Sequence, residues 1–295
     1  QGHTALNCFE WMQSEGLLAD VVTFTSLLKA CSITGTIAKG KQIHDEIVTR
    51  GFLKTDMVLG NALVDMYAKC GALAQAEEVL DKLPVQDVVC WNALITGYAQ
   101  EGQGHEVLNC FEQMQNEGLS PDAVTFTSVL NACAGTEDVE KGKEMHAEVM
   151  YRGLLKKDVV LGNALVDMYA KCNALSEAQN VLDGLPIHNV VSWSALISGY
   201  AQQDRGHEAL ETFDKMQEKG FYPDAITFVG VLKACGSTWA ISKGKLIHEV
   251  IVTRGLLEKD IGLGNALVDM YAKFGMLTKA KQVLEQLSLR DIVSW

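Results

Sequence analysis

The sequence repeats itself with a period of 102 residues, and this period limits the possible folds more than any other feature. The segment Leu-Gly-Asn-Ala-Leu-Val-Asp-Met-Tyr-Ala-Lys begins at Leu59, Leu161 and Leu263. A fixed long period indicates one structural unit stacked on copies of itself, with a core that runs through the stack. The 295 residues are therefore expected to form one extended array.

The apolar spacing inside the repeat is helical. Leu73, Ala76, Val79 and Leu80 follow one another at three- and four-residue steps, as on the buried stripe of an amphipathic helix. Gly71, just before this stripe, suits the left-handed residue that ends a preceding helix. Each unit is therefore predicted to be a hairpin of two helices, and the fold class to be all-α.

Composition excludes several other classes. Although 48% of the residues are hydrophobic, no segment approaches the ~20 apolar residues that span a bilayer, so no membrane partner is expected. The chain begins at Gln1, inside a repeat, and shows no transit peptide. We therefore interpret it as an excised fragment.

Seven of the eight cysteines recur with the repeat, and in the third copy two of their positions hold Phe274 and Thr212, which replace neither a disulfide partner nor a metal ligand. We interpret the cysteines as small buried packing residues in a reducing compartment, with no metal or cofactor. Their recurring positions are Cys31, Cys133 and Cys235; Cys70 and Cys172; Cys8 and Cys110.

Three segment types alternate along the chain. Val88–Ile95 with Pro121-Asp122 resembles the P motif of the plant PLS-class pentatricopeptide repeat family, whose RNA-editing factors are the nearest type. Val129–Cys133 with Gly142–His146 resembles its L motif, and Gly162–Cys172 its S motif. The resemblance implies a right-handed superhelical α-solenoid of antiparallel helical hairpins.

On this resemblance the chain divides into eight whole units and two partial ones. They are a partial P repeat at 1–20, L at 21–56, S at 57–87, P at 88–122, L at 123–158, S at 159–189, P at 190–224, L at 225–260, S at 261–291, and the start of a P repeat at 292–295.

The fifth residue of each unit is small and polar in seven of the eight whole units. Amides and hydroxyls at a fixed spacing can address the edges of splayed bases, one base per repeat. They can instead bond neighbouring helices and hold the array together. These residues are Thr25, Asn61, Asn92, Thr127, Asn163, Ser194 and Asn265, with Val229 in the remaining unit.

The resemblance implies that the fifth residue pairs with the last residue of its unit to choose a base. Asn with Asp implies U, Thr or Ser with Asp implies G, and Asn with Asn implies C. The target is then 5′-GUUGCGNU-3′, with N at the unit where Val229 departs from the pattern. The terminal residues are Asp56, Asp87, Asp122, Asp158, Asn189, Asp224, Asp260 and Asp291.

Two further positions recur. In the family the second residue packs between successive bases, while interhelix packing is the alternative function of this position. These residues are Val22, Val58, Val89, Val124, Val160, Val191 and Ile226, with Gly262 in the last unit. Lys69, Lys171 and Lys273 end the first S helices, where they can approach phosphate or simply complement the helix dipole.

The net charge of −12 argues against nucleic acid, since phosphate binding relies on Lys and Arg, unless the acidity lies on the second helices. An enzyme is not expected: His44-Asp45-Glu46 matches half of a zinc-deaminase signature, but no Cys-x-x-Cys exists anywhere in the sequence. A tetratricopeptide-like protein-binding scaffold is the alternative to RNA binding.

The resemblance also implies partners and a location. It implies single-stranded RNA as ligand, multiple organellar RNA editing factor proteins at the L units, and a deaminase supplied in cis or in trans. It places the protein in a plant organelle, either the chloroplast or the mitochondrion.

Overall fold

The structure is a computed structural model that describes residues 2–156, 158–257 and 260–287. These residues form 17 α-helices and two short 3-10 helices with no strand, so the all-α prediction is confirmed. The first helices of the hairpins are α2 (Val21–Thr34), α4 (Met57–Lys69), α6 (Val88–Gln100), α8 (Ala123–Thr136), α10 (Val159–Lys171), α12 (Val190–Gln202), α14 (Ala225–Thr238) and α16 (Ile261–Lys273).

The second helices alternate with them along the chain. They are α1 (Gly2–Ser14), α3 (Ile37–Thr49), α5 (Leu73–Lys82), α7 (Gly104–Asn116), α9 (Val139–Tyr151), α11 (Leu175–Gly184), α13 (Gly206–Glu218), α15 (Ile241–Thr253) and α17 (Leu277–Gln286). The 3-10 helices η1 (Phe52–Lys54) and η2 (Leu154–Lys156) follow α3 and α9. Within the described residues, no helix is both long and apolar enough to cross a membrane.

The hairpins form where the apolar spacing and the glycines predict them. All four stripe residues of α5 are buried: Leu73, Ala76, Val79 and Leu80. Gly71 has a φ of +71°, the left-handed conformation that ends α4 and turns the chain into α5.

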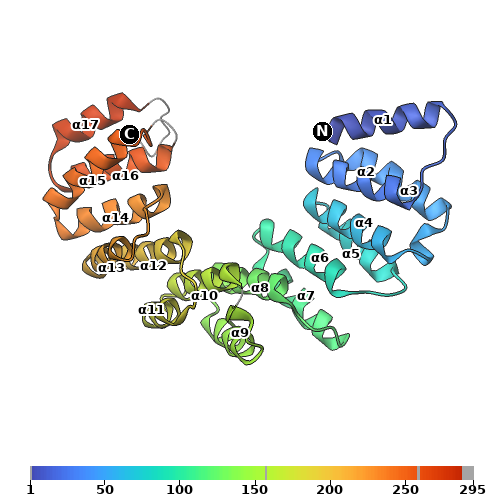
Figure 1. Cartoon of the computed structure of the whole chain (residues 1–295), viewed down its shortest axis with the longest axis horizontal. Coiled ribbons are helices and arrows are strands. Elements are labelled where there is room, and N and C mark those ends of the chain that lie inside the picture. The colour runs from blue at the N-terminus through green and yellow to red at the C-terminus, as the bar shows by residue number, and fades with distance from the viewer. Residues whose placement is uncertain (1, 157, 258–259, 288–295) are drawn as a thin grey trace. The chain divides into compact units, whose positions relative to one another are not determined.

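Two compact units make up the chain, Gln1–Thr136 and Glu137–Trp295. In the first, α2, α4, α6 and α8 pack against one another in chain order, and in the second α10, α12, α14 and α16 do the same (Figure 1). A second helix such as α5 or α13 packs between its own first helix and the next one. Each unit is therefore a layered stack of hairpins, as in an α-solenoid.

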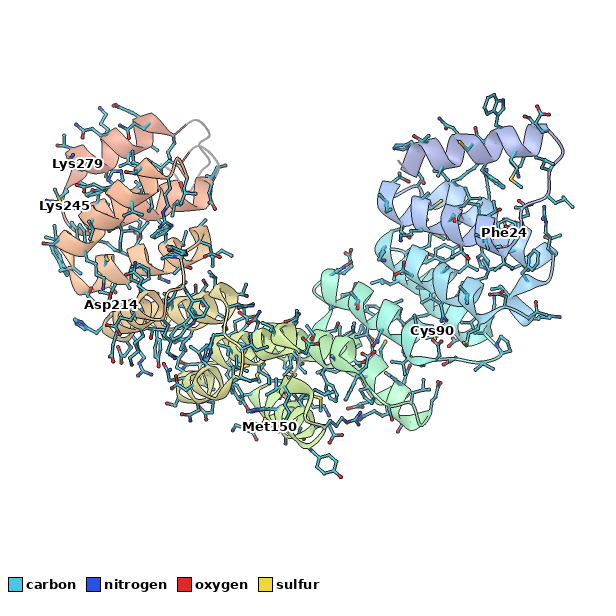
Figure 2. All side chains as sticks on the ribbon, viewed as in Figure 1. Phe24, Cys90, Met150, Asp214, Lys245 and Lys279 are labelled. Atoms are coloured by element: carbon cyan, nitrogen blue, oxygen red, sulfur yellow. The ribbon has the colours of Figure 1, made fainter. Side chains whose placement is uncertain are left out.

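Large apolar side chains fill the space between the layers. Phe24 and Cys90 are fully buried among the helices, while Met150 on α9 is exposed (Figure 2). A β-carbon added at Gly97 would lie 2.9 Å from that of Ala68, so α6 approaches α4 closely because this position has no side chain. This close approach aligns the first helices that carry the candidate site.

Candidate functional site

The seven aliphatic residues at the second position are all exposed, although they lie on helices that bury most of their other apolar residues. Their exposed fractions run from 53% at Val124 to 71% at Val22. Interhelix packing would bury these side chains, so it does not explain why the position is aliphatic. A row of exposed aliphatic groups at one position of successive repeats is typical of a binding surface.

The terminal residue of a unit has a structural function that the sequence analysis missed, because it is the N-cap of the next first helix. The Asp87 carboxylate accepts hydrogen bonds from the backbone N–H groups of Val89 and Cys90, as expected for an N-cap residue. The same capping contact is made by Asp56, Asp122, Asp158, Asn189, Asp224 and Asp260. Asp291 lies outside the described residues.

Among the described residues, the fifth residue contacts this capping residue in three units. Nδ2 of Asn61 donates to Oδ2 of Asp87 over 2.9 Å, and Nδ2 of Asn92 donates to Oδ1 of Asp122 over 3.0 Å. Oγ of Ser194 lies 3.4 Å from Oδ1 of Asp224, and it also bonds the backbone oxygen of Val190 on its own helix over 2.8 Å. The predicted pairing of these two positions is therefore a physical contact in one S unit and both complete P units.

The Asn61 contact also affects the ionisation of its partner. Burial acts to raise the pKa of Asp87, but the backbone N–H of Cys90 and the Asn61 amide donate hydrogen bonds that outweigh it, and the pKa is lowered. The carboxylate thus stays charged near neutral pH. The Oδ1 atom of Asn61 is buried and makes no hydrogen bond within the described part of the chain.

The other fifth-position residues are arranged differently. The hydroxyl groups of Thr25 and Thr127 each donate to the backbone of their own helix over 2.8 Å, at Val21 O and Ala123 O. Thr127 and its predicted partner Asp158 lie in different compact units. Within the first compact unit, Thr25 therefore does not make with Asp56 the direct side-chain contact seen at Asn92.

Asn163, Val229 and Asn265 complete the set. The carbonyl oxygen of Asn163 is buried and makes no hydrogen bond among the described residues. Val229 is half-buried and has no polar side-chain atom. Asn265 is half-buried as well, and its predicted partner Asp291 is outside the described residues.

A groove of about 540 Å³ brings the three kinds of position together in the first compact unit. Its lining includes Asn61, Val89, Asn92, Asp122 and Val124, contributed by α4, α6 and the start of α8. The volume is in the range of ordinary ligand clefts. A planar group entering the groove would meet aliphatic side chains and an amide paired with a carboxylate.

The second compact unit has a corresponding groove of about 300 Å³ between α10, α12 and α14. Val191, Ser194, Asp224 and Ile226 line it at the same repeat positions. Gln100 lines the first groove and Gln202 lines the second. These two polar residues were not predicted as site residues, although their 102-residue spacing is visible in the sequence.

The lysines at the ends of the S helices are paired with aspartates. Nζ of Lys69 lies 2.8 Å from the Asp65 carboxylate, four residues earlier on the same helix. Lys171 pairs with Asp167, and Lys273 with Asp269, over the same distance. A phosphate approaching these lysines would therefore compete with a carboxylate that already neutralises them.

The acidity of the chain lies mainly away from the first helices. Those eight helices contain three Asp and five Lys, a net charge of +2. The nine second helices contain 19 acidic and 10 basic residues, a net charge of −9. The seven aspartates that cap the first helices lie just outside these helix bounds and change the net charge from +2 to −5, so the candidate site is itself acidic, though less so than the second helices.

The histidines and most cysteines fit a structural function, but three cysteines are less buried than predicted. Cys8 is exposed, and Cys70 and Cys172 are half-buried. Among the described helices α1 packs against α2, whereas α7, which carries the buried Cys110, packs against both α6 and α8. His44 hydrogen-bonds the Tyr67 hydroxyl over 3.0 Å, and the pairs of His146 and His248 repeat this bond. Among the described residues, no group of three or more His, Cys, Asp or Glu could hold a metal.

The stacked hairpins and the recurring positions define a helical-repeat protein of the α-solenoid class. Matches to the PPR repeat family cover residues 86–135 and 188–237, and matches to the PPR repeat cover 22–52, 61–88, 124–154 and 265–292. These matches span more than half of the sequence, so the chain belongs to the pentatricopeptide repeat family.

Relatives of known name agree with this assignment. A putative mitochondrial pentatricopeptide repeat-containing protein of Arabidopsis thaliana is 34% identical over 290 residues, which are 98% of this chain and 48% of the relative. A chloroplastic pentatricopeptide repeat-containing protein of the same plant is 35% identical over 294 residues, 100% of this chain and 47% of the relative. The chain spans about half the length of these relatives.

Solved structures show the same fold. The crystal structure of the pentatricopeptide repeat protein PPR10 in complex with an 18-nt psaJ RNA element superposes with a TM-score of 0.80 at 23% identity. The superposition covers 97% of this chain and 42% of PPR10. At this identity the likeness establishes a shared PPR solenoid fold.

Proposed function

We propose that this chain binds single-stranded RNA by sequence, with one nucleotide per repeat. The observation that carries the proposal is the groove in which exposed Val89 and Val124 flank the hydrogen-bonded pair of Asn92 and Asp122. Aliphatic side chains can cover the faces of a base, and an amide beside a carboxylate can address its edge. The crystal structure of PPR10 in complex with an RNA element supports the same class of ligand.

The hydrogen bonds support the proposed target 5′-GUUGCGNU-3′ more strongly at some units than at others. The second and third bases face Asn61 and Asn92, whose amides donate to their capping residues. The sixth base faces Ser194, whose hydroxyl bonds its own helix and lies 3.4 Å from its capping residue. The first and fourth bases face Thr25 and Thr127, whose hydroxyls are bound to their own helices. The two G assignments at those L units therefore draw no support from a side-chain pair.

The wider proposal concerns the process that the RNA binding serves. We propose a plant organellar protein of the PLS class that specifies a site for C-to-U editing or for RNA processing. The mitochondrial and chloroplastic names of its relatives support an organelle. This segment would select the RNA, while a deaminase in cis or in trans would supply the chemistry, with multiple organellar RNA editing factor proteins as partners at the L units.

Selection of bound RNA from a random pool tests the proposal, followed by gel shift with the proposed octamer, its scramble and the corresponding DNA. Enrichment of the proposed sequence, with tighter binding than to the scramble and the DNA, is the expected result. Equal or absent binding to all three would refute RNA recognition. It would favour the protein-binding scaffold, whose partner would meet the acidic second helices.

A further inference from the structure

A threonine at the start of the L unit reaches back to the preceding P unit. Thr125 is fully buried at the third position of its unit, and its Oγ1 lies 2.6 Å from Oδ1 of Asn92 and 3.1 Å from Oδ1 of Asp122. Thr227 is also fully buried and lies 2.6 Å from both Ser194 Oγ and Asp224 Oδ1. In both cases one hydroxyl bridges the two side chains of the proposed base-reading pair.

The proton of the Thr125 hydroxyl goes to Asn92. Oδ1 of Asp122 already accepts from the backbone N–H groups of Val124 and Thr125 and from Nδ2 of Asn92, at 2.9 to 3.0 Å. The Asn92 carbonyl oxygen is the nearer acceptor, at 2.6 Å rather than 3.1 Å, and it accepts fewer other hydrogen bonds. Asn92 is therefore held at both ends of its amide, which leaves one N–H and one lone pair for a ligand.

The first two S units lack this bridge. The third position of the unit after each of them holds Cys90 and Ser192, and these residues donate to the backbone carbonyls of Asp87 and Asn189. The Oδ1 atoms of Asn61 and Asn163 are buried without a hydrogen bond among the described residues. The amide of Asn92 is thus fixed by a contact that the amides of Asn61 and Asn163 do not have.

We infer that Thr125 and Thr227 are positioning residues that set how sharply the preceding P unit discriminates between bases. The inference rests on the proposed function, because it assigns a task within RNA reading. An amide held in one orientation offers its donor and its acceptor at fixed places, whereas a freer amide can rotate and accept other bases. Specificity at a P unit then depends on three residues, one of them in the next unit.

Helix capping is the rival explanation, because Thr125 also accepts from the backbone N–H of its capping residue, Asp122. The chain provides a matched control in Thr23, the third residue of the first L unit. Thr23 Oγ1 donates to the capping Asp20 over 2.7 Å, but this chain contains no fifth residue of a preceding P unit. A change at Thr23 therefore alters a cap without altering a base-reading pair.

The test measures the Kd of four octamers that differ at the third base, for the wild type and for T125V, T125S and T23V. In T125V, the preference for U at this base should fall about fivefold, the equivalent of one hydrogen bond. Preferences at the second base should not change. T125S should restore the preference because it keeps the hydroxyl, and T23V should match the wild type.

A measurement without RNA checks the contact itself. In ¹⁵N-edited spectra, the Nδ2 proton signals of Asn92, assigned through their loss in N92S, should shift in T125V and stay in place in T23V. A wild-type preference for U that survives intact in T125V would overturn this inference alone. No base preference in the wild type would overturn the proposed function and the inference with it.

Discussion

Replacing Asn92 by Ser is the sharpest test of base reading, because the chain already contains the product of that change. Ser194 occupies the same position 102 residues later, with Asp224 and Thr227 around it as Asp122 and Thr125 surround Asn92. The variant should therefore reproduce a local structure that the fold accommodates elsewhere. Preference at the third base should move from U to G.

The size of the shift follows from the hydrogen bonds. The Asn92 amide has one N–H and one lone pair left for a base, and each hydrogen bond contributes about 0.5–1.5 kcal/mol. Losing both lowers the preference for U by about 1–3 kcal/mol, or roughly 5- to 150-fold in Kd. The serine hydroxyl can bond Thr125 as Ser194 bonds Thr227, so the free energy of unfolding should fall by less than about 1 kcal/mol.

Fluorescence anisotropy with four labelled octamers that differ at the third base measures this shift. The reciprocal variant, Ser194→Asn, is the matched control, and it should move the sixth base from G to U while leaving the third base unchanged. If N92S still prefers U over G at the third base while its fold is intact, the assignment of this position to base reading is wrong.

Three other changes probe the surroundings of the site. Asp65→Asn releases Lys69, so RNA affinity should rise and the slope of log Kd against log salt should steepen by about 0.7, as one added phosphate contact predicts; an unchanged slope would exclude phosphate contact. Val89→Ser removes an exposed aliphatic side chain, so Kd should rise about fivefold while the melting temperature stays unchanged; a large loss of stability would point to packing instead. Burial lowers the pKa of His146, which bonds Tyr169. The folded state therefore favours neutral His146. As the pH falls below about 6.5, the ordinary pKa of histidine, the unfolded chain binds a proton more readily than the folded one, and stability is lost. His146→Asn should weaken this loss in melts at pH 7.5 and 5.5, and an identical loss in both proteins would contradict the assignment.

Local signals in the sequence predicted the hairpins well. The apolar stripe from Leu73 to Leu80 and the glycine at 71 are short-range features. In the structure the stripe is buried, and Gly71 has a positive φ. Burial at Cys8 was predicted wrongly. Cys8 is equivalent to Cys110 in the repeat, but among the described helices α1 packs against one neighbour and α7 against two. A repeat pattern does not say how many helices pack against each copy.

The capping function of the terminal residues could have been predicted. An Asp directly before an apolar run, as at Asp20 and Asp87, is an ordinary helix start signal. The cap and the proposed pairing use the same group, because the Asp87 carboxylate caps α6 while it accepts a hydrogen bond from the Asn61 amide.

The bridge from Thr125 to Asn92 had no such signal. The two residues are 33 positions apart, and their contact depends on the packing of α6 against α8. A threonine near a helix start reads as a capping residue, which it also is. The division of charge between first and second helices was equally hidden, because it requires knowing which helix each residue belongs to.

The terminal carboxylate caps a helix and, on the proposed function, also contacts a base. This limits which substitutions can give such an array a new RNA target. A change at Asp122 that removes the cap would cost about 1 kcal/mol of folding free energy, and on the proposed function it would also change the preference for the adjacent base. Substitutions there are tolerated chiefly among Asp, Asn, Ser and Thr. A change of RNA target, whether by evolution or by design, should therefore occur mostly through substitution of the fifth residue. The terminal residue should change less often, and only to another residue that can cap a helix.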